Sequence, residues 1–180
     1  MRFCSSCGAP IERKVPEGED RSRDVCTACG EIFYRNPKVV AGAIPEWRGE
    51  ILFCRRAIGP REGFWTLPAG FMEMRETTAA AAARETLEEA NARIVDPALY
   101  CYFDIPRISQ VYVMFRARLA EPRFSPGYES LETRLFEIAE IPWDELAFPA
   151  IELTLRRYVT DLEAGHFVVH NETIDRMPGE

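Results

Sequence analysis

The sequence lacks an uninterrupted apolar run of the roughly 18 residues that would mark a membrane-spanning helix. It also lacks the apolar core of a secretory signal, because Cys4 and Cys7 stand near the first residue with no apolar stretch behind them. From these two absences we expect a cytoplasmic protein.

Basic residues are too few to outnumber the acidic ones. The chain has 22 Lys and Arg against 29 Asp and Glu, which gives a formal net charge of −7. Broad nucleic-acid binding needs a basic surface, so we do not expect nucleic acid as a partner. An anionic small molecule would have to be bound at a local site by metal ions and a few arginines.

Histidine, a common metal ligand, is also scarce. The two in the chain, His166 and His170, fall in a predicted short C-terminal strand over 166–170, and we expect both at the surface. Cysteine supplies the metal-binding pattern instead. Four cysteines form two Cys-x2-Cys pairs, the spacing of a closed, structural four-thiolate zinc site. The expected zinc ligands are Cys4, Cys7, Cys26 and Cys29.

The competing interpretation of these cysteines is a pair of disulfides, which a cytoplasmic location disfavours. The segment between the pairs mixes acidic and basic residues. We therefore expect residues 1–32 to form a zinc ribbon that acts as a scaffold or helps to form a dimer. Cys54 and Cys101 lie in apolar, strand-like runs and are expected to be buried free thiols.

The stretch from Gly70 to Ala92 predicts a loop and then a helix. Thr77 or Thr78 can cap the helix, and the alanines that follow favour helix. A helical wheel of about 100° per residue gathers three carboxylates on one side. A second side, which we expect to face a sheet, carries small and apolar residues. The carboxylates are Glu85, Glu88 and Glu89; the second side holds Ala79, Ala83, Thr86, Leu87 and Ala90.

Carboxylates at such spacings repel one another unless something cationic lies among them. Mg²⁺ or Mn²⁺, which prefer oxygen ligands, would fill that role. Glu85 and Glu89, one turn apart, are the first-choice ligands, and Glu88 would bind a further metal or order a water. Arg84 lies on another face and is expected to orient a carboxylate such as Glu76.

The spacing also resembles the Nudix box, GX5EX7REUXEEXGU, in which U is a bulky aliphatic residue. The matching positions are Gly70, Glu76, Arg84-Glu85 and Glu88-Glu89, and LPAG precedes the box. Two positions depart from it. Thr86 replaces an aliphatic residue, and its hydroxyl can bond to a carbonyl one turn earlier. Asn91 replaces the second glycine, a mild change because Asn tolerates the left-handed conformation that ends a helix.

Strand-like runs over 39–44, 51–56, 100–103, 111–119 and 135–138 alternate with the box helix and a second predicted helix over 150–164. This order predicts an α/β sandwich: a mixed sheet with helices on both faces, preceded by the small ribbon. The Nudix fold has the same plan. We expect the main domain over residues 37–165 and a C-terminal strand and tail over 166–180.

Beyond the box, most of the chain is similar to ribbon-bearing Nudix hydrolases that act on FAD and ADP-ribose. The segments that carry this likeness are YRNPK at 34–38, FWTLPAG at 64–70 and PGYESLETRLF at 126–136. The resemblance implies cleavage to AMP plus FMN or ribose 5-phosphate, and a homodimer. The NADH pyrophosphatases are the rival group; this chain keeps their Ser-Gln at Ser109-Gln110 but lacks their aromatic and proline residues. A non-catalytic, ligand-sensing Nudix module is a second alternative.

The resemblance also implies a wider site. The Ala69 carbonyl and Glu129 would join Glu85, Glu88 and Glu89 as ligands for magnesium or manganese. The general base varies within the family; Glu129, Glu132 and Glu88 are the candidates. An adenine or flavin ring would need an aromatic platform, offered by Phe33, Tyr34, Tyr102, Phe103 or Tyr112, and Arg55, Arg56 and Arg107 could meet phosphate. The predicted substrate-binding residues are Tyr34, Arg55, Arg107 and Gln110.

Overall fold

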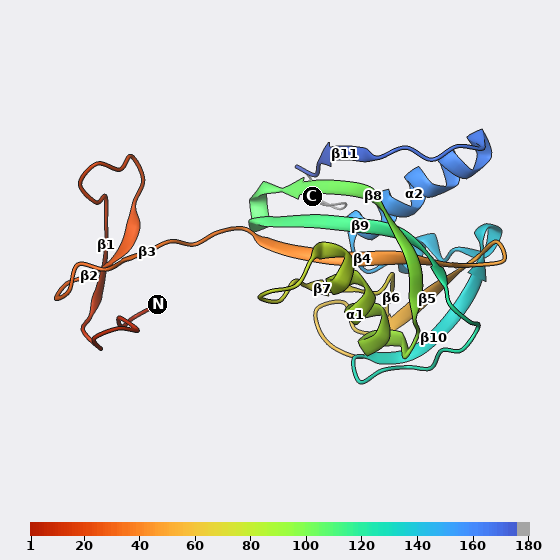
Figure 1. Cartoon of the computed structure of the whole chain (residues 1–180), viewed down its shortest axis with the longest axis horizontal. Coiled ribbons are helices and arrows are strands. Elements are labelled where there is room, and N and C mark those ends of the chain that lie inside the picture. Colours follow the sequence, from red (N-terminus) through yellow and green to blue (C-terminus); the bar gives the residue numbers. More distant parts are fainter. Residues whose placement is uncertain (176–180) are drawn as a thin grey trace. The chain divides into compact units, whose positions relative to one another are not determined.

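The computed structural model describes residues 1–175, and the end of the predicted tail, 176–180, lies outside the described residues. The chain divides into two compact units, Met1–Asn36 and Pro37–Glu180 (Figure 1). None of the helices described is both long and apolar enough to cross a membrane.

The first unit is a three-stranded antiparallel sheet in the order β1-β2-β3. The first cysteine pair lies before β1, and the second lies at the end of β2 and in the turn that follows it. Phe33, just beyond the predicted ribbon over 1–32, belongs to β3, whose pairing with β2 extends the unit. The strand bounds are Ile11–Lys14 for β1, Arg23–Cys26 for β2 and Ile32–Phe33 for β3.

The second unit is built on a mixed sheet in the order β10-β5-β4-β9-β8-β11, with β6 paired to β5 and β7 to β4. β4 runs parallel to β9 and β11 runs parallel to β8, as the predicted mixed sheet requires. The strands are β4 Lys38–Trp47, β5 Glu50–Arg56, β6 Trp65–Thr66, β7 Ala69–Phe71, β8 Ile94–Ile105, β9 Gln110–Leu119, β10 Ser130–Glu137 and β11 His170–Thr173. The helices are α1 Thr78–Ala90 and α2 Pro149–Ala164, with 3₁₀ turns η1 Pro106–Ile108, η2 Ile138–Glu140 and η3 Trp143–Glu145.

The two helices cover opposite faces of this sheet (Figure 1). The period-two alternation of β4 shows how. Val40 and Ile44 belong to the core cluster that contains Ile151 and Leu155 of α2. Ala41 and Ala43, pointing the other way, pack with small α1 alanines in a second cluster. The small side chains on that face let α1 lie close to the sheet, and Glu85 of α1 lies against Gly70 of β7.

The last strand, β11, begins at His170, four residues later than the predicted start at His166. Gly165 ends α2 in the left-handed conformation, and Phe167 then packs beside the rings of Tyr100 and Tyr158 instead of entering the sheet. Phe167 packs on Tyr158 of α2, whereas Val168 and Val169 are exposed, so the apolar composition of this run did not indicate a strand position.

His170 also differs from the expectation of a surface residue, whereas His166 is exposed as predicted. The His170 Nε2 atom lies 2.9 Å from Asp161 Oδ2, and its side chain is largely buried. Asp161 also accepts hydrogen bonds from the Tyr100 hydroxyl, at 3.0 Å, and from the backbone N–H of Val168, at 3.2 Å. One carboxylate thus joins α2, β8 and the segment leading into β11. Burial opposes the charge of Asp161, but the bonds from His170, Val168 and Tyr100 outweigh it and lower the pKa of this carboxyl.

Replacing Asp161 by Ala is expected to lower the free energy of unfolding at pH 7 by about 3 kcal/mol, because the buried Tyr100 hydroxyl and the Val168 N–H lose their acceptor. Since the folded-state pKa is depressed, this stabilisation is present above the carboxyl's unfolded pKa. It disappears as the pH falls through the folded pKa, so the difference from wild type should shrink in acid. Urea unfolding at several pH values measures both effects. Glu163→Ala, at an exposed position on the same helix, is the control; an equal loss in both variants would contradict this account.

Candidate active site

The predicted box helix is confirmed as α1. Thr77 caps it, its hydroxyl accepting from the Ala80 N–H at 3.1 Å, and Asn91 ends it in the left-handed conformation with φ 48°. The Thr86 hydroxyl donates to the Ala82 carbonyl at 2.7 Å, as expected from a threonine at this position. Neither departure from the box disturbs the helix.

The buried side of α1 is rotated from the predicted apolar side. Leu87, expected to face the sheet, is 45% exposed, whereas Glu85 and Glu89 are each only 8% exposed. Burying two carboxylates costs free energy unless hydrogen bonds or cations compensate. The helical wheel predicted the wrong buried side because it selects the side with the most apolar residues, and here the buried side is partly acidic.

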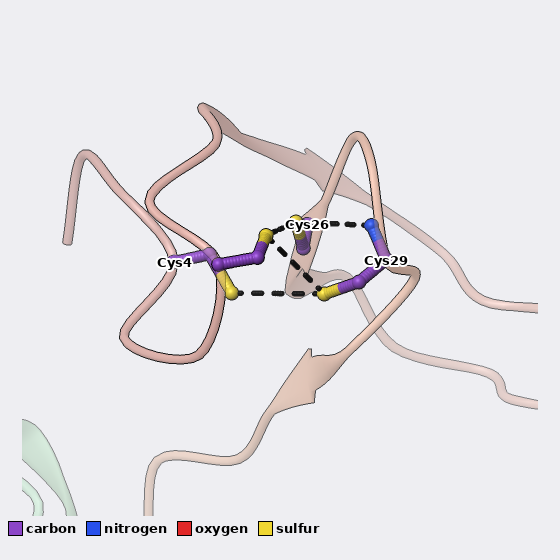
Figure 2. Close-up of side chains that lie close together, drawn as sticks. Cys4, Cys26 and Cys29 are labelled. Atoms are coloured by element: carbon purple, nitrogen blue, oxygen red, sulfur yellow. Dashed lines mark hydrogen bonds between the residues drawn. The ribbon is translucent and has the colours of Figure 1, made fainter.

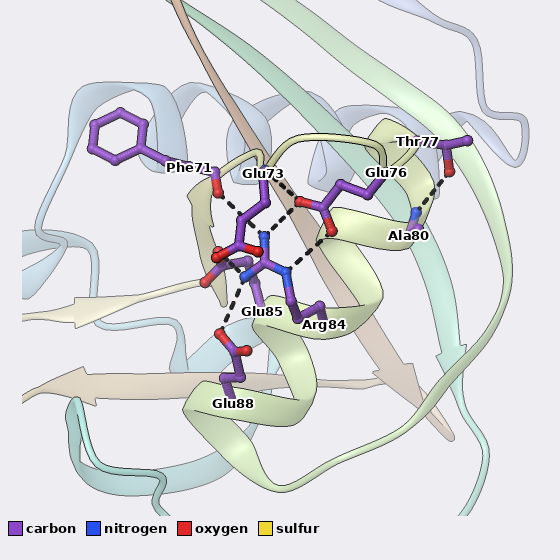
Figure 3. Close-up of polar contacts among 8 residues, drawn as sticks. All are labelled: Phe71, Glu73, Glu76, Thr77, Ala80, Arg84, Glu85 and Glu88. Atoms are coloured by element: carbon purple, nitrogen blue, oxygen red, sulfur yellow. Dashed lines mark hydrogen bonds and ion pairs between the residues drawn. The ribbon is translucent and has the colours of Figure 1, made fainter. Parts of the chain in front are cut away.

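Arg84 supplies one part of the compensation (Figure 3). Its guanidinium lies 2.7 Å from Glu76 Oε1, 2.7 Å from Glu85 Oε1 and 3.1 Å from Glu88 Oε2, and it also donates to the Phe71 carbonyl. The predicted pairing with Glu76 is therefore present, with two further carboxylates. The hydrogen bonds from Arg84 and from the Glu73 N–H lower the pKa of Glu76, whereas burial raises the pKa of Glu85 despite its bond to Arg84.

Gly70 explains how the Glu85 carboxylate fits against β7. A Cβ atom at this position would lie 2.4 Å from the carboxyl atoms of Glu85, well inside contact distance. β7 itself is held against β4, with Gly70 opposite Ala41. The first glycine of the box is thus required because the backbone and a carboxylate approach closely.

Among the described carboxylates, Glu89 has the pKa that is shifted furthest from its ordinary value. Burial raises its pKa from the ordinary 4.5 to about 8, and the charges of Glu85 and Glu129 add to the effect. Arg56 and a backbone hydrogen bond from Ala69 act in the opposite direction. Glu129, which lies just before β10, therefore shares this region with Glu85 and Glu89 of α1, although it is distant from them in the sequence. Carboxylate oxygens are the ligands that a hard divalent cation prefers, but among the described residues these three do not converge as closely as the four cysteine sulfurs do.

The structure does not bring every predicted site residue into this group. Glu88 is largely exposed and pairs with Arg84. Glu132, on β10, lies opposite Arg55 of β5, and their side chains approach to 3.8 Å. Arg55 also donates to the Gly63 carbonyl at 2.9 Å.

The other predicted substrate contacts are dispersed. Tyr34 lies in the ribbon unit, where its hydroxyl donates to Glu19 at 2.7 Å and Arg23 lies over its ring. Arg107 is exposed in η1, and Gln110 begins β9, opposite Lys38 and Ile105. Of the aromatic rings considered as platforms, Phe103 is fully buried and Tyr112 nearly so, which leaves no face of Phe103 for a ligand.

One arginine near the carboxylates was considered for phosphate contact but was not chosen among the predicted substrate-binding residues. Arg56 acts on the charge of Glu89, whereas the prediction chose its neighbour Arg55. Residues 51–54 are all buried, so no alternation of polar and apolar positions indicated which arginine faces the site.

The four predicted zinc ligands converge in the first unit, and Figure 2 labels three of them, Cys4, Cys26 and Cys29. Their sulfur atoms lie within 4.8 Å of one another, with contacts of 3.7 Å for Cys4–Cys29, 3.4 Å for Cys7–Cys26 and 3.6 Å for Cys7–Cys29. A tetrahedron with Zn–S bonds of about 2.3 Å has edges of about 3.8 Å, so the arrangement fits zinc. The backbone N–H groups of Cys29 and Ala28 lower the pKa of Cys26 to about 6, which favours the thiolate that zinc needs. The six cysteines are free thiols, and Cys54 and Cys101 are buried as predicted.

Comparison with protein families decides the classification. The model of the NUDIX domain matches residues 36–161, more than half of the chain. The chain belongs to the Nudix family. A second model, a zinc ribbon described as Nudix N-terminal, matches residues 2–35 of this Nudix protein and agrees with the cysteine cluster.

Known proteins similar to this Nudix protein include enzymes with different named substrates. The NAD-capped RNA hydrolase NudC of Stutzerimonas stutzeri is 29% identical over 163 residues, which cover 89% of this chain and 55% of that protein. The chain thus spans about half the length of this curated relative. A solved NUDIX hydrolase from Nitrosomonas europaea is 50% identical, with a TM-score of 0.94 over 98% of this chain and 100% of that one. An ADP-ribose pyrophosphatase from Streptococcus suis shares the fold, at 20% identity and a TM-score of 0.59 over 77% of this chain and 100% of that one.

Proposed function

We propose that this Nudix protein hydrolyses the diphosphate bond of a nucleoside diphosphate derivative, ADP-ribose or FAD, to AMP plus ribose 5-phosphate or FMN. The observation that carries the proposal is the placement of Glu89: a buried carboxylate near Glu85, Glu129 and the backbone of Ala69. A buried acid with a raised pKa beside other acids is typical of a functional site, and its family makes diphosphate hydrolysis the matching chemistry.

Glu85, Glu89 and Glu129, with the Ala69 carbonyl, would hold magnesium or manganese. A bound divalent cation offsets the charge of the diphosphate, polarises its phosphoryl oxygens and lowers the pKa of a bound water. Arg84 orients the Glu85 carboxylate through the 2.7 Å ion pair, and Gly70 leaves room for it. Glu88, tied to Arg84, would hold a further metal or order a water.

Among the candidate bases we favour Glu129. It lies close enough to raise the pKa of both Glu85 and Glu89, yet it is exposed, so it can exchange a proton with solvent after each turnover. Glu132 faces Arg55, and the Glu88 carboxylate is engaged by Arg84. Arg56 would meet the phosphates, because its charge already acts on Glu89.

The alternative substrates are NADH and NAD-capped RNA. The 29% identity with NudC over most of the chain favours them, and it keeps nucleic acid open as a partner despite the net negative charge. Against them stands the missing aromatic and proline array after Ser109-Gln110. The ligand-sensing alternative is disfavoured because the four box glutamates are all present. The homodimer and the choice between Mg²⁺ and Mn²⁺ stay predictions.

Turnover of ADP-ribose, FAD, NADH and NAD-capped RNA, each with Mg²⁺ and with Mn²⁺, tests the proposal. We expect kcat/KM for ADP-ribose or FAD to exceed the values for NADH and NAD-capped RNA by about tenfold or more. Highest turnover on NAD-capped RNA or NADH would instead establish the NudC-like alternative. Binding of these ligands without any turnover would contradict the enzymatic proposal and establish the sensor.

A further inference from the structure

The segment that carries Glu129 is fastened to the C-terminal end of α1. The Ser125 N–H donates to the Ala90 carbonyl at 2.9 Å, and the Gly127 N–H donates to the Glu89 carbonyl at 2.9 Å. A Cβ at Gly127 would lie 1.7 Å from the Glu88 carbonyl oxygen, so the two backbones are in direct contact. The loop 125–130 therefore rests on the same helical turn that carries the buried acid.

The side chain of Asn91 completes this attachment. Its Nδ2 atom donates to the Ser125 carbonyl at 3.2 Å and to the Pro126 carbonyl at 3.1 Å. The residue occupies the position where the Nudix box has its second glycine, which has no side chain to make either bond. The substitution keeps the left-handed conformation and adds two contacts between the helix end and the loop.

Downstream of this attachment the loop has little freedom before the sheet begins. The Ser130 N–H donates to the Gly127 carbonyl at 3.1 Å, and the Glu129 carbonyl accepts from the Ala57 N–H at 2.8 Å. Glu129, two residues from Gly127, is therefore held between the helix end and Ala57, the residue that follows β5. Because the loop is exposed, its position depends on these bonds more than on packing.

We propose that Asn91 is a positioning residue, which fixes Glu129 beside Glu85 and Glu89 by fastening the loop 125–130 to the end of α1. The proposal rests on the proposed function, because it assigns Glu129 to that site. Three backbone bonds between the loop and the rest of the chain remain without the amide, two to α1 and one from Ala57, so its loss should loosen the loop without releasing it.

The test uses Asn91→Gly and Asn91→Asp, each made in wild type and in Glu129→Gln. Glycine and aspartate both tolerate the left-handed conformation, and neither can donate to the two carbonyls. We expect each variant to weaken Mn²⁺ binding to the substrate-free protein by about fivefold, measured by electron paramagnetic resonance, and to lower kcat on the preferred substrate by about tenfold. In the Glu129→Gln background both effects should fall below about twofold, because the residue being positioned is gone.

Asp96→Gly, a left-handed position on β8, controls for a general effect of such substitutions. Equal effects of the Asn91 variants in both backgrounds, or Mn²⁺ affinity and kcat that match wild type, would overturn the positioning role. A wild-type protein that neither binds Mn²⁺ nor turns over any substrate would overturn the proposed function and this inference together. An active wild type with fully active Asn91 variants would overturn the inference alone.

Discussion

The Glu89→Gln variant is expected to lose about 10³-fold in kcat, which corresponds to about 4 kcal/mol of transition-state stabilisation. The amide has nearly the shape of the carboxylate but cannot supply the negative charge that a divalent cation needs. Glu85 and Glu129 lie near Glu89 but cannot supply the charge that the substitution removes. We therefore expect the Mn²⁺ affinity of the substrate-free protein to fall as well. Steady-state kinetics on ADP-ribose or FAD and a Mn²⁺ titration measure the two losses.

The same variant should not be less stable than wild type. Burial raises the pKa of Glu89 from 4.5 to about 8, so folded, metal-free wild type binds more protons than the unfolded chain between these values. Its stability therefore falls as the pH rises through this range, and the Gln variant lacks this loss. Thermal unfolding of metal-free protein at about pH 8.5, roughly half a unit above that pKa, checks this. Glu163→Gln, on the exposed side of α2, is the matched control. Retained turnover in Glu89→Gln would contradict the assignment of Glu89.

Zinc removal is expected to have the largest effect on folding. The expected effect is unfolding of the first unit, Met1–Asn36, while the second unit stays folded. The buried apolar side chains of that unit are Cys4, Pro16, Val25 and Cys26, and the three core clusters lie in the second unit. So small an apolar core cannot offset the loss of conformational entropy, whereas structural zinc contributes about 10–16 kcal/mol. We expect Cys26→Ser to lose its zinc and the dispersed amide resonances of residues 1–36, while the resonances of the second unit persist.

Cys54→Ala is the control for this experiment, because Cys54 is buried in the second unit and should leave zinc content unchanged. The substitution acts on the zinc site alone, whereas a chelator would also remove metal from the carboxylates. Persistence of the ribbon resonances in Cys26→Ser would show that the unit folds without zinc. Wild-type protein without zinc and four hydrogens lighter than the reduced chain would establish the two disulfides instead.

How far the sequence predicted the site is clearest in α1. Thr77, Asn91 and the Thr86 back-bond were predicted because capping and helix ends depend on neighbours within one turn. The predicted buried side was wrong, because it included Leu87, which is exposed, and left out Glu85 and Glu89, which are buried. A helical wheel ranks the sides of a helix by apolar content, and this helix buries acidic residues. The crowded carboxylates were expected to need a metal ion. Arg84 supplies part of the positive charge that the carboxylates need. It pairs with Glu88 one turn later and with Glu76 in the preceding loop, contacts that a helical wheel does not describe.

The sequence by itself determined the zinc ribbon, the box helix and the alternation of strands with two helices, because each depends on spacing along the chain. Tertiary structure alone decided that Glu89 has a pKa near 8, that Glu129 and not Glu132 lies beside it, and that Asn91 holds the loop between them. Burial and charge interactions depend on residues tens of positions apart. Their consequences therefore exist only after the sheet has brought those residues together.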